Sequence, residues 1–191
     1  MKNAEVIIDI KMGRKISYWL KEGKQSKITP KIRKIAESFH GDEFDKIYQI
    51  LEWIEKNAPH TSDTSKVEKI FTSRNAEKII IDKFNIGCHD TAVLTATFLR
   101  ALKIPAKFIE GIDKLSPQDS GHCVVEAYIK GKWILIDPSY FTLSLKPKRN
   151  PFYEKNYVIG VGVDSWDNGI KTFNDWKKKS EKIIKQVEKI H

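Results

Sequence analysis

Apolar residues recur at helical spacing in the first third of the chain, so each predicted helix there buries one face. Thr29 and Pro30 form a common helix start, and Asp42 and Ser73 are polar residues of the kind that cap helices. The helices expected from these signals cover residues 30–40, 42–57 and 75–83. Residues 60–66 are polar and are expected to form a turn. We expect the helices over 30–40 and 42–57 to pack and not to carry chemistry.

The middle of the chain changes from helical to extended spacing. Apolar positions repeat at helical spacing over residues 88–103 and stop before Pro105, which predicts a mostly buried helix. Runs rich in Val, Ile and aromatic residues follow and predict strands over 106–112, 122–129 and 132–136. Lys130 and Gly131 separate the last two runs and fit a two-residue hairpin loop.

A loop of that length would determine how the last two strands pair. Ile129 would face Lys132, and Asp137 would then lie opposite Val124. His122 lies on the same face as Val124, which places Asp137 diagonal to His122 at a backbone separation of roughly 7 to 8 Å. An imidazole and a carboxylate can bridge that separation with their side chains. A loop longer by one residue would turn Asp137 to the other face of the sheet.

The C-terminal segment predicts one further helix. Thr172 and Asp175 can cap it. Its apolar stripe comprises Phe173, Trp176, Ile183, Ile184, Val187 and Ile190. The glycine-containing stretch 160–164 lacks the Lys-Ser/Thr pair of a phosphate loop. At 191 residues the chain is expected to form a single domain, with an N-terminal helical part over 1–69, a core over 70–140 and a C-terminal extension over 141–191.

Composition and charge narrow the classes of function. Lys and Arg number 34 against 25 Asp and Glu, a net charge of +9, but the positive runs are not interleaved with aromatic residues and match no nucleic-acid-binding motif. Nucleic acid is therefore not the expected partner. No apolar run is long enough to span a membrane, and two cysteines do not make the disulfide framework of a small secreted domain. We expect a cytoplasmic protein with free thiols, and its oligomeric state stays open.

Cys88 is the candidate nucleophile, because it opens the helix predicted over 88–103. Unpaired N–H groups and the positive end of the helix dipole favour a thiolate there and can also donate to an oxyanion. A free thiol has a pKa of about 8.5 and needs a base at neutral pH. His122 would supply that base, and Asp137 would orient the imidazole and stabilise its charged form. Attack by Cys88 on an amide would release an amine and leave a thioester, which water or a second amine would then resolve.

Four blocks of sequence around these residues resemble the core of the transglutaminase-like superfamily. The blocks are Gly87-Cys88-x-Asp90-x-Ala92, Leu99 to Ala106, His122-x-Val124-x-Glu126-Ala127 and Trp133-x-x-x-Asp137-Pro138, and the likeness covers about residues 70–140. The resemblance implies an α+β fold of the papain-like type, with the nucleophile helix packed on an antiparallel β-sheet and additional N-terminal and C-terminal helices. It also implies catalytic roles for Cys88, His122 and Asp137, with a peptide or protein amide as the substrate.

Microbial members of this superfamily include peptidases, amidases and cross-linking enzymes. A cysteine protease or amidase is the first hypothesis. The alternatives are a protein-glutamine gamma-glutamyltransferase, which joins glutamine side chains to amines, and a non-catalytic binding module that uses the same groove. Hydrolysis ranks first because the sequence marks neither an amine-binding site nor the Asp-rich loop of a calcium site. No cofactor and no metal are expected.

The groups that would stabilise an oxyanion follow less directly. The Cys88 backbone N–H is one expected donor. Many relatives carry an aromatic residue, often Tyr, after the helix that corresponds to residues 43–57, whereas this chain reads Asn57-Ala58-Pro59-His60. The candidates for a second donor are therefore Asn85 and His60.

Other polar residues lie near these candidates in the sequence. Asp90 and Glu126 could tune the site, or could simply pair with Arg100 or with lysines. His89 is expected to be half-exposed, because successive side chains on a helix point about 100° apart. Cys123 faces the other side of its strand from the candidate base and is expected in the core.

Overall fold

The computed structural model describes residues 14–189 and is built around one β-sheet. Its strands are β1 (Ala106–Asp113), β2 (Gly121–Ile129), β3 (Lys132–Asp137), β4 (Thr142–Ser144) and β5 (Asn156–Gly162). They form an antiparallel sheet in the order β4-β3-β2-β1-β5. The three strands expected from the sequence are the middle of this sheet, each within one residue of its expected bounds at either end.

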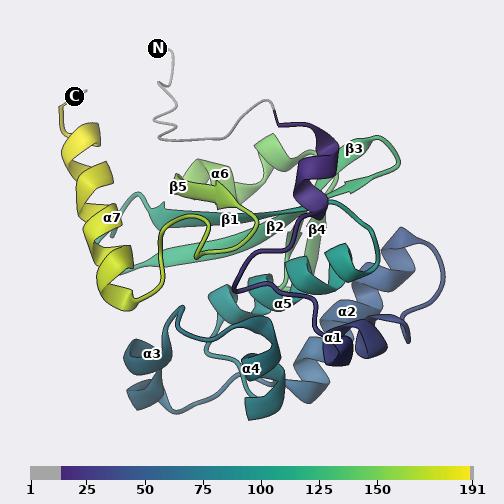
Figure 1. Cartoon of the computed structure of the whole chain (residues 1–191). Helices are drawn as coiled ribbons and strands as arrows, with labels where there is room; N and C mark the ends of the chain where they lie inside the picture. The colour runs from purple at the N-terminus through teal and green to yellow at the C-terminus, as the bar shows by residue number, and fades with distance from the viewer. Residues whose placement is uncertain (1–13, 190–191) are drawn as a thin grey trace.

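Helices cover the sheet, most of them on one face. They are η1 (Ile16–Leu20), α1 (Pro30–Ala36), α2 (Glu43–Asn57), α3 (Thr64–Ile70), α4 (Ala76–Asp82), α5 (Cys88–Ala101), η2 (Pro147–Arg149), α6 (Pro151–Lys155) and α7 (Phe173–Val187), where η marks a 3-10 helix. In Figure 1, α1 to α5 lie together below the sheet, α6 lies above it and α7 stands at one side, packed against β5. No helix within residues 14–189 is long and apolar enough to cross a membrane. Because these helices pack on an antiparallel sheet, the fold is α+β, as expected.

Side-chain caps set the starts of most of these helices. The expected caps that the structure contains are Thr29 for α1, Asp42 for α2 and Thr172 for α7. The cap expected at Ser73 is wrong. Asn75 caps α4 and accepts a hydrogen bond from the Lys78 N–H at 2.8 Å. The Ser73 hydroxyl is engaged elsewhere, because it donates to the Ile70 carbonyl oxygen at the end of α3.

Two N-terminal segments differ from the expected bounds. Helix α1 is shorter than expected, because the N–H groups of Ser38 and Phe39 bond to carbonyl oxygens three residues back and tighten the chain into a turn. Helix α3 begins inside the stretch 60–66, which was expected to be a turn. Asp63 starts this helix and accepts a hydrogen bond from the Ser65 N–H at 3.2 Å.

The sequence does not predict β5, although it forms one edge of the sheet. Its two glycines interrupt the alternation that marks a strand. They are needed there, because a Cβ built on Gly160 would lie 2.6 Å from Cγ of Asn168, and one on Gly162 would lie 2.5 Å from Oδ1 of the same residue. Glycine thus leaves room for the segment 164–170 to fold back over β5.

Helix α5 is buried along almost its whole length, from His89 to Arg100. Its apolar side chains join those of α1, α2, α4 and one sheet face in the largest hydrophobic cluster. Arg100 is fully buried and donates to the carbonyl oxygens of Trp19 at 3.2 Å and Ala106 at 2.8 Å. The segment that contains Trp19 and the start of β1 therefore cover the C-terminal end of α5.

The β2–β3 hairpin has the expected register. Ile129 pairs with Lys132, and the pairing runs without a shift to Val125 opposite Ile136. The loop residues Lys130 and Gly131 have φ of 47° and 84°, the positive values of a two-residue hairpin turn. The prediction that places Asp137 diagonal to His122 on one face is thereby confirmed.

Candidate active site

His122 and Asp137 are hydrogen-bonded across the β2–β3 hairpin. The distance from His122 Nε2 to Asp137 Oδ2 is 2.7 Å, and the Ser139 N–H donates to Asp137 Oδ1 at 3.1 Å. Asp137 is buried and His122 is half-buried, so bulk water screens this pair only in part. Because Nε2 bonds to the carboxylate, Nδ1 is the ring nitrogen left to face another group.

Cys88 is the first residue of α5, where backbone N–H groups have no partner within the helix. Gly87 precedes it as the N-cap with φ of 118°, a conformation that residues with a side chain rarely adopt. The Gly87 N–H donates to Asn85 Oδ1 at 2.8 Å and holds the turn in place. Cys88 itself is half-buried and packs against the main hydrophobic cluster.

Charge favours a thiolate at Cys88 and an imidazolium at His122. The pKa of Cys88 is lowered well below its ordinary value by a hydrogen bond from Cys123, against the opposing effect of burial, and by a hydrogen bond and charge from His122. Burial alone would lower the pKa of His122, but hydrogen bonds with Asp137 and Cys88 raise it to about 10. The two opposite charges would thus stabilise each other.

Cys123 lies in the core, as expected, and it also contacts Cys88. Its hydrogen bond to Cys88, together with burial, raises the pKa of Cys123 well above its ordinary value. A neutral Cys123 thiol can therefore donate to the Cys88 sulfur. Strand alternation could have identified this contact, because it turns Cys123 toward the face on which α5 packs.

The two candidate second donors have different surroundings. Asn85 is buried, and its amide group donates to the Ala58 carbonyl oxygen at 2.6 Å while its carbonyl oxygen holds Gly87. His60 is exposed, with Nδ1 at 3.3 Å from Asn85 Oδ1 and Cε1 at 3.9 Å from the position of a Cβ on Gly87. Asn85 thus supports the turn before α5, and His60 lies beside that turn.

Asp90 is a buried anchor for the same turn. It pairs with Arg74 and accepts a hydrogen bond from the Ile86 N–H at 3.1 Å. Arg74 also pairs with Asp82 at 3.1 Å, which ties α4 to α5. Of the pairings considered for Asp90, neither Arg100 nor a lysine is correct, because its partner is Arg74 and Arg100 lies at the far end of α5. Asp90 therefore holds the segment that precedes Cys88.

Glu126 is also engaged in a structural contact. Its carboxylate accepts from Lys107 Nζ and from the Tyr153 hydroxyl, each at 2.8 Å. Burial, together with the Glu126 charge, raises the pKa of Tyr153, so this hydroxyl stays a donor. Of the two pairings expected for Glu126, the one with a lysine is correct, and it joins β1, β2 and α6.

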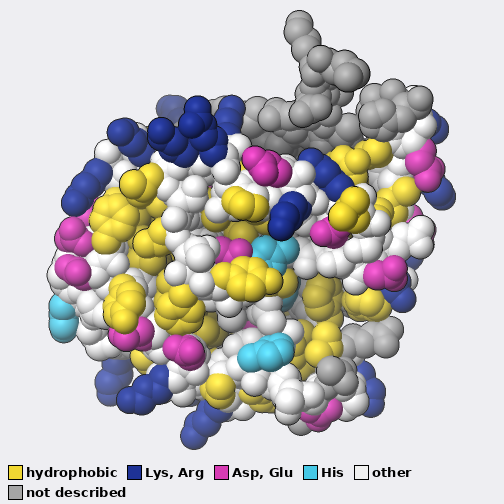
Figure 2. All heavy atoms as spheres, turned by 180° about the vertical axis from the view of Figure 1, so that it is seen from behind, with side chains coloured by type: hydrophobic (Ala, Val, Ile, Leu, Met, Phe, Trp, Pro, Cys, Tyr) yellow, Lys and Arg dark blue, Asp and Glu magenta, His cyan; other side chains and the backbone are white. Residues whose placement is uncertain are grey.

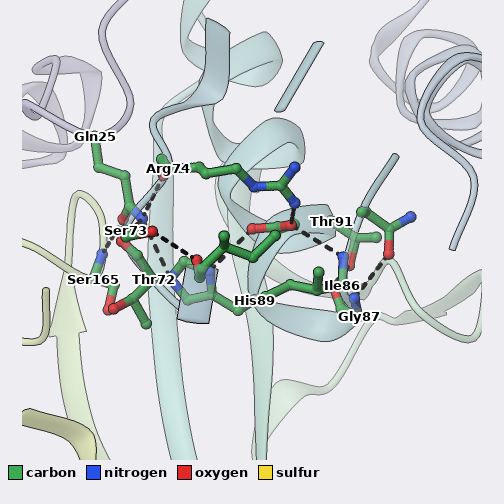
Figure 3. A network of polar contacts seen from close by, with 12 residues as sticks. Gln25, Thr72, Ser73, Arg74, Ile86, Gly87, His89, Thr91 and Ser165 are labelled. Carbon is green, nitrogen blue, oxygen red and sulfur yellow. Dashed lines mark hydrogen bonds and ion pairs between the residues drawn. The ribbon is translucent and has the colours of Figure 1, made fainter. Parts of the chain in front are cut away.

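His89 is buried with 2% exposure, so the expectation of a half-exposed side chain is wrong. Figure 3 shows it within a polar network that links α5 to Gln25 and Ser165. His89 Nδ1 lies 3.4 Å from Asp90 Oδ1, and its Nε2 lies 3.4 Å from the Gln25 amide nitrogen. Gln25 donates to the Thr72 carbonyl oxygen and accepts from the Ser165 N–H. The network joins both ends of the chain to the first turn of α5.

Within residues 14–189, the His, Cys, Asp and Glu side chains form no group of three or more that could hold a metal ion.

A family model described as the transglutaminase-like superfamily matches residues 32–138. Among solved structures, a candidate cysteine protease from Cytophaga hutchinsonii is 24% identical, with a TM-score of 0.60 over 85% of this chain and 52% of its own. LapG from Legionella pneumophila is 14% identical, with a TM-score of 0.47 over 82% of this chain and 98% of its own. No curated protein matches the sequence.

The family match covers more than half of the chain, including all the residues from α2 to the end of β3. The chain spans about half the length of the Cytophaga hutchinsonii protein. The likeness to that protein supports the fold: a buried helix packed on an antiparallel sheet. The chain belongs to the transglutaminase-like superfamily and has its papain-like α+β core.

Proposed function

We propose that this protein is a cysteine-dependent acyl hydrolase that cleaves peptide-like amides through a thioester on Cys88. The observation that supports this most strongly is the position of His122. Its ring bonds to Asp137 at 2.7 Å and also interacts with the Cys88 thiol. A nucleophile, a base and a group that orients the base are the parts that covalent acyl transfer requires.

In the proposed first step, the Cys88 thiolate attacks the carbonyl carbon of the amide. The oxygen becomes an oxyanion, which the unpaired N–H groups at the start of α5 can stabilise. His122, already protonated, gives its proton to the leaving nitrogen as the carbon–nitrogen bond breaks. An amine leaves and the acyl group stays on sulfur as a thioester.

In the second step, water attacks the thioester. Neutral His122 takes a proton from that water, and Asp137 stabilises the imidazolium that forms. Collapse of the second tetrahedral intermediate expels the Cys88 thiolate and releases a carboxylic acid. The ion pair between Cys88 and His122 is then restored.

Exposure of the site favours water over an amine as the acceptor. Cys88 and His122 are half-buried, and Tyr140, whose ring lies 5.5 Å from the His122 ring, is 72% exposed. A cross-linking enzyme must keep water from its thioester long enough for an amine to attack. An open site of this kind supports hydrolysis, and cross-linking is the alternative that the same chemistry permits.

One experiment separates the two outcomes. The full chain is incubated with a pool of peptides and a labelled primary amine, and the products are identified by mass spectrometry. We expect new carboxyl termini or glutamine deamidation, and loss of both products in Cys88→Ala. Transfer of the label to glutamine at a rate above hydrolysis would favour cross-linking, and no product in either channel would contradict the proposed function.

A further inference from the structure

Exposed apolar side chains are concentrated in one short segment after β3. Of the eight large hydrophobic residues that are exposed within residues 14–189, four lie between residues 140 and 145. We call these four the apolar rim: Tyr140, Phe141, Leu143 and Leu145. Tyr140 is 72% exposed and Leu145 is 66% exposed. Scattered exposed hydrophobic residues need no explanation, but a group of four within six positions is typical of a binding surface.

The apolar rim is continuous with the candidate active site. Tyr140 follows Asp137 closely in the chain, and its ring centroid lies 5.5 Å from that of His122. Ser139 Oγ lies 3.3 Å from Thr91 Oγ1, in the first turn of the helix that Cys88 opens. A molecule that reaches the His122 ring from solvent therefore also touches the start of the rim. In Figure 2, hydrophobic side chains lie against histidine side chains in the middle of the face shown.

The rim also contains an edge strand. β4 is the last strand of the sheet order on its side, and it pairs with β3 from Asp137 opposite Thr142 to Leu135 opposite Ser144. An edge strand presents N–H and C=O groups that an extended peptide can pair with. Peptides bound in this way place alternate side chains toward the surface of the sheet. The rim can therefore take an extended chain and contact its apolar side chains.

The segment that contains the rim carries only positive charge. Residues 138–153 contain three cations, Lys146, Lys148 and Arg149, and no Asp or Glu. All three cations are exposed. Exposed cations attract acidic groups and disfavour basic ones. A peptide that lies along the rim would thus meet apolar side chains first and cations next.

We propose that the apolar rim and these three cations bind the substrate, an extended peptide that carries large apolar side chains near the cleaved amide and carboxylates beyond them. This inference rests on the proposed hydrolase function and specifies its substrate class. Residues of the rim select the substrate, whereas Cys88 and His122 act on the amide.

The test compares two reactions of the full chain. Hydrolysis of para-nitrophenyl acetate requires the thiol and the base but offers no peptide to the rim. Cleavage of a proteome-derived peptide pool, read by mass spectrometry, reports the residues around each cut bond. We expect enrichment of aromatic and large aliphatic residues near the bond, with Asp and Glu beyond them. A peptide from this set then provides kcat/KM values.

Variants of the rim assign the preference to it. In Leu143→Ser with Leu145→Ser, the ratio of kcat/KM for the peptide to kcat/KM for the ester should fall about tenfold, because two apolar contacts are lost. Ile81→Ser, an exposed apolar residue on α4, is the matched control and should leave the ratio unchanged. Replacement of Lys146, Lys148 and Arg149 by Glu should reverse the charge preference toward basic peptides.

The outcomes distinguish this inference from the function on which it rests. Absence of ester hydrolysis by the unmodified protein would contradict the hydrolase function, and the inference with it. Ester hydrolysis without peptide cleavage, or with no residue preference, would overturn the rim as a substrate surface and leave the thiol chemistry standing. An unchanged ratio of peptide to ester kcat/KM in the Leu143→Ser, Leu145→Ser variant would also overturn the rim as a substrate surface. A dimer that this variant dissociates in sedimentation would assign the rim to a second copy of the chain and overturn the inference.

Discussion

His122 and Asp137 are fifteen residues apart in the sequence, yet their side chains meet at 2.7 Å because the loop between their strands contains only Lys130 and Gly131. The bond places a carboxylate against Nε2 of a half-buried imidazole. Such a carboxylate favours the charged ring and restricts its orientation. The strength of this interaction can be measured both in catalysis and in the titration of His122.

Replacement of Asp137 by Asn should weaken the base. An amide cannot stabilise the imidazolium as a carboxylate does, so we expect kcat/KM to fall about a hundredfold or more. The pKa of His122, which Asp137 helps to raise to about 10, should fall as well. Steady-state kinetics and the proton NMR titration of the ring test both effects. Glu55→Gln, the same change at an exposed site on α2, is the control, and equal losses in the two variants would contradict the assigned role.

The dependence of activity on pH should be bell-shaped. The reactive form needs Cys88 without its proton and His122 with one. Activity should therefore be lost at acid pH, as the depressed pKa of Cys88 is passed, and lost again at alkaline pH near the His122 pKa of about 10. A profile of kcat/KM against pH measures both limbs. A single rising limb near the pKa of an ordinary thiol would show that no ion pair forms.

Cys123 should control the reactivity of Cys88. The hydrogen bond from Cys123 has the largest effect in lowering the pKa of Cys88, so Cys123→Ala should move that pKa upward. Cys123→Ser keeps a donor and should remain closer to the unmodified protein. The rate of alkylation by iodoacetamide, followed at Cys88 by peptide mass spectrometry as a function of pH, measures the shift. Identical midpoints in the Ala and Ser variants would be inconsistent with this hydrogen bond.

Arg74 should stabilise the protein through Asp90. Both side chains are buried, so Arg74→Met leaves an unpaired buried carboxylate and should lower the free energy of unfolding by about 3 to 5 kcal/mol. Lys130→Met breaks the exposed pair with Asp42 and should cost no more than about 1 kcal/mol. Urea unfolding followed by circular dichroism gives both values. Similar losses in the two variants would mean that the buried pair contributes no more than the exposed one.

Local signals in the sequence predict the central part of the fold well. The register of the β2–β3 hairpin depends only on the length of one loop, and Lys130 and Gly131 are suited to that loop. The start of α5 at Cys88 follows from the apolar period behind it and from Gly87 before it. Both are decided by residues adjacent in the chain, which is why a single sequence is sufficient to predict them.

Features that depend on distant segments were predicted poorly. His89 is buried because Gln25 and the segment 164–170 close over the first turn of α5, and no local pattern connects these parts of the chain. The same segment explains why Gly160 and Gly162 occur in β5. The pairing of Asp90 with Arg74 instead of Arg100 likewise depends on how α4 packs on α5.

The most direct test of the central claim is to identify the residue that carries the acyl group. The protein is mixed with para-nitrophenyl acetate, quenched in acid within the first turnover and digested for mass spectrometry. Acetyl on the peptide that contains Cys88, and its absence from His122→Ala quenched at the same time, is the predicted result. Acetyl on Cys123 instead, or ester hydrolysis that persists in Cys88→Ala, would contradict the claim that Cys88 is the nucleophile.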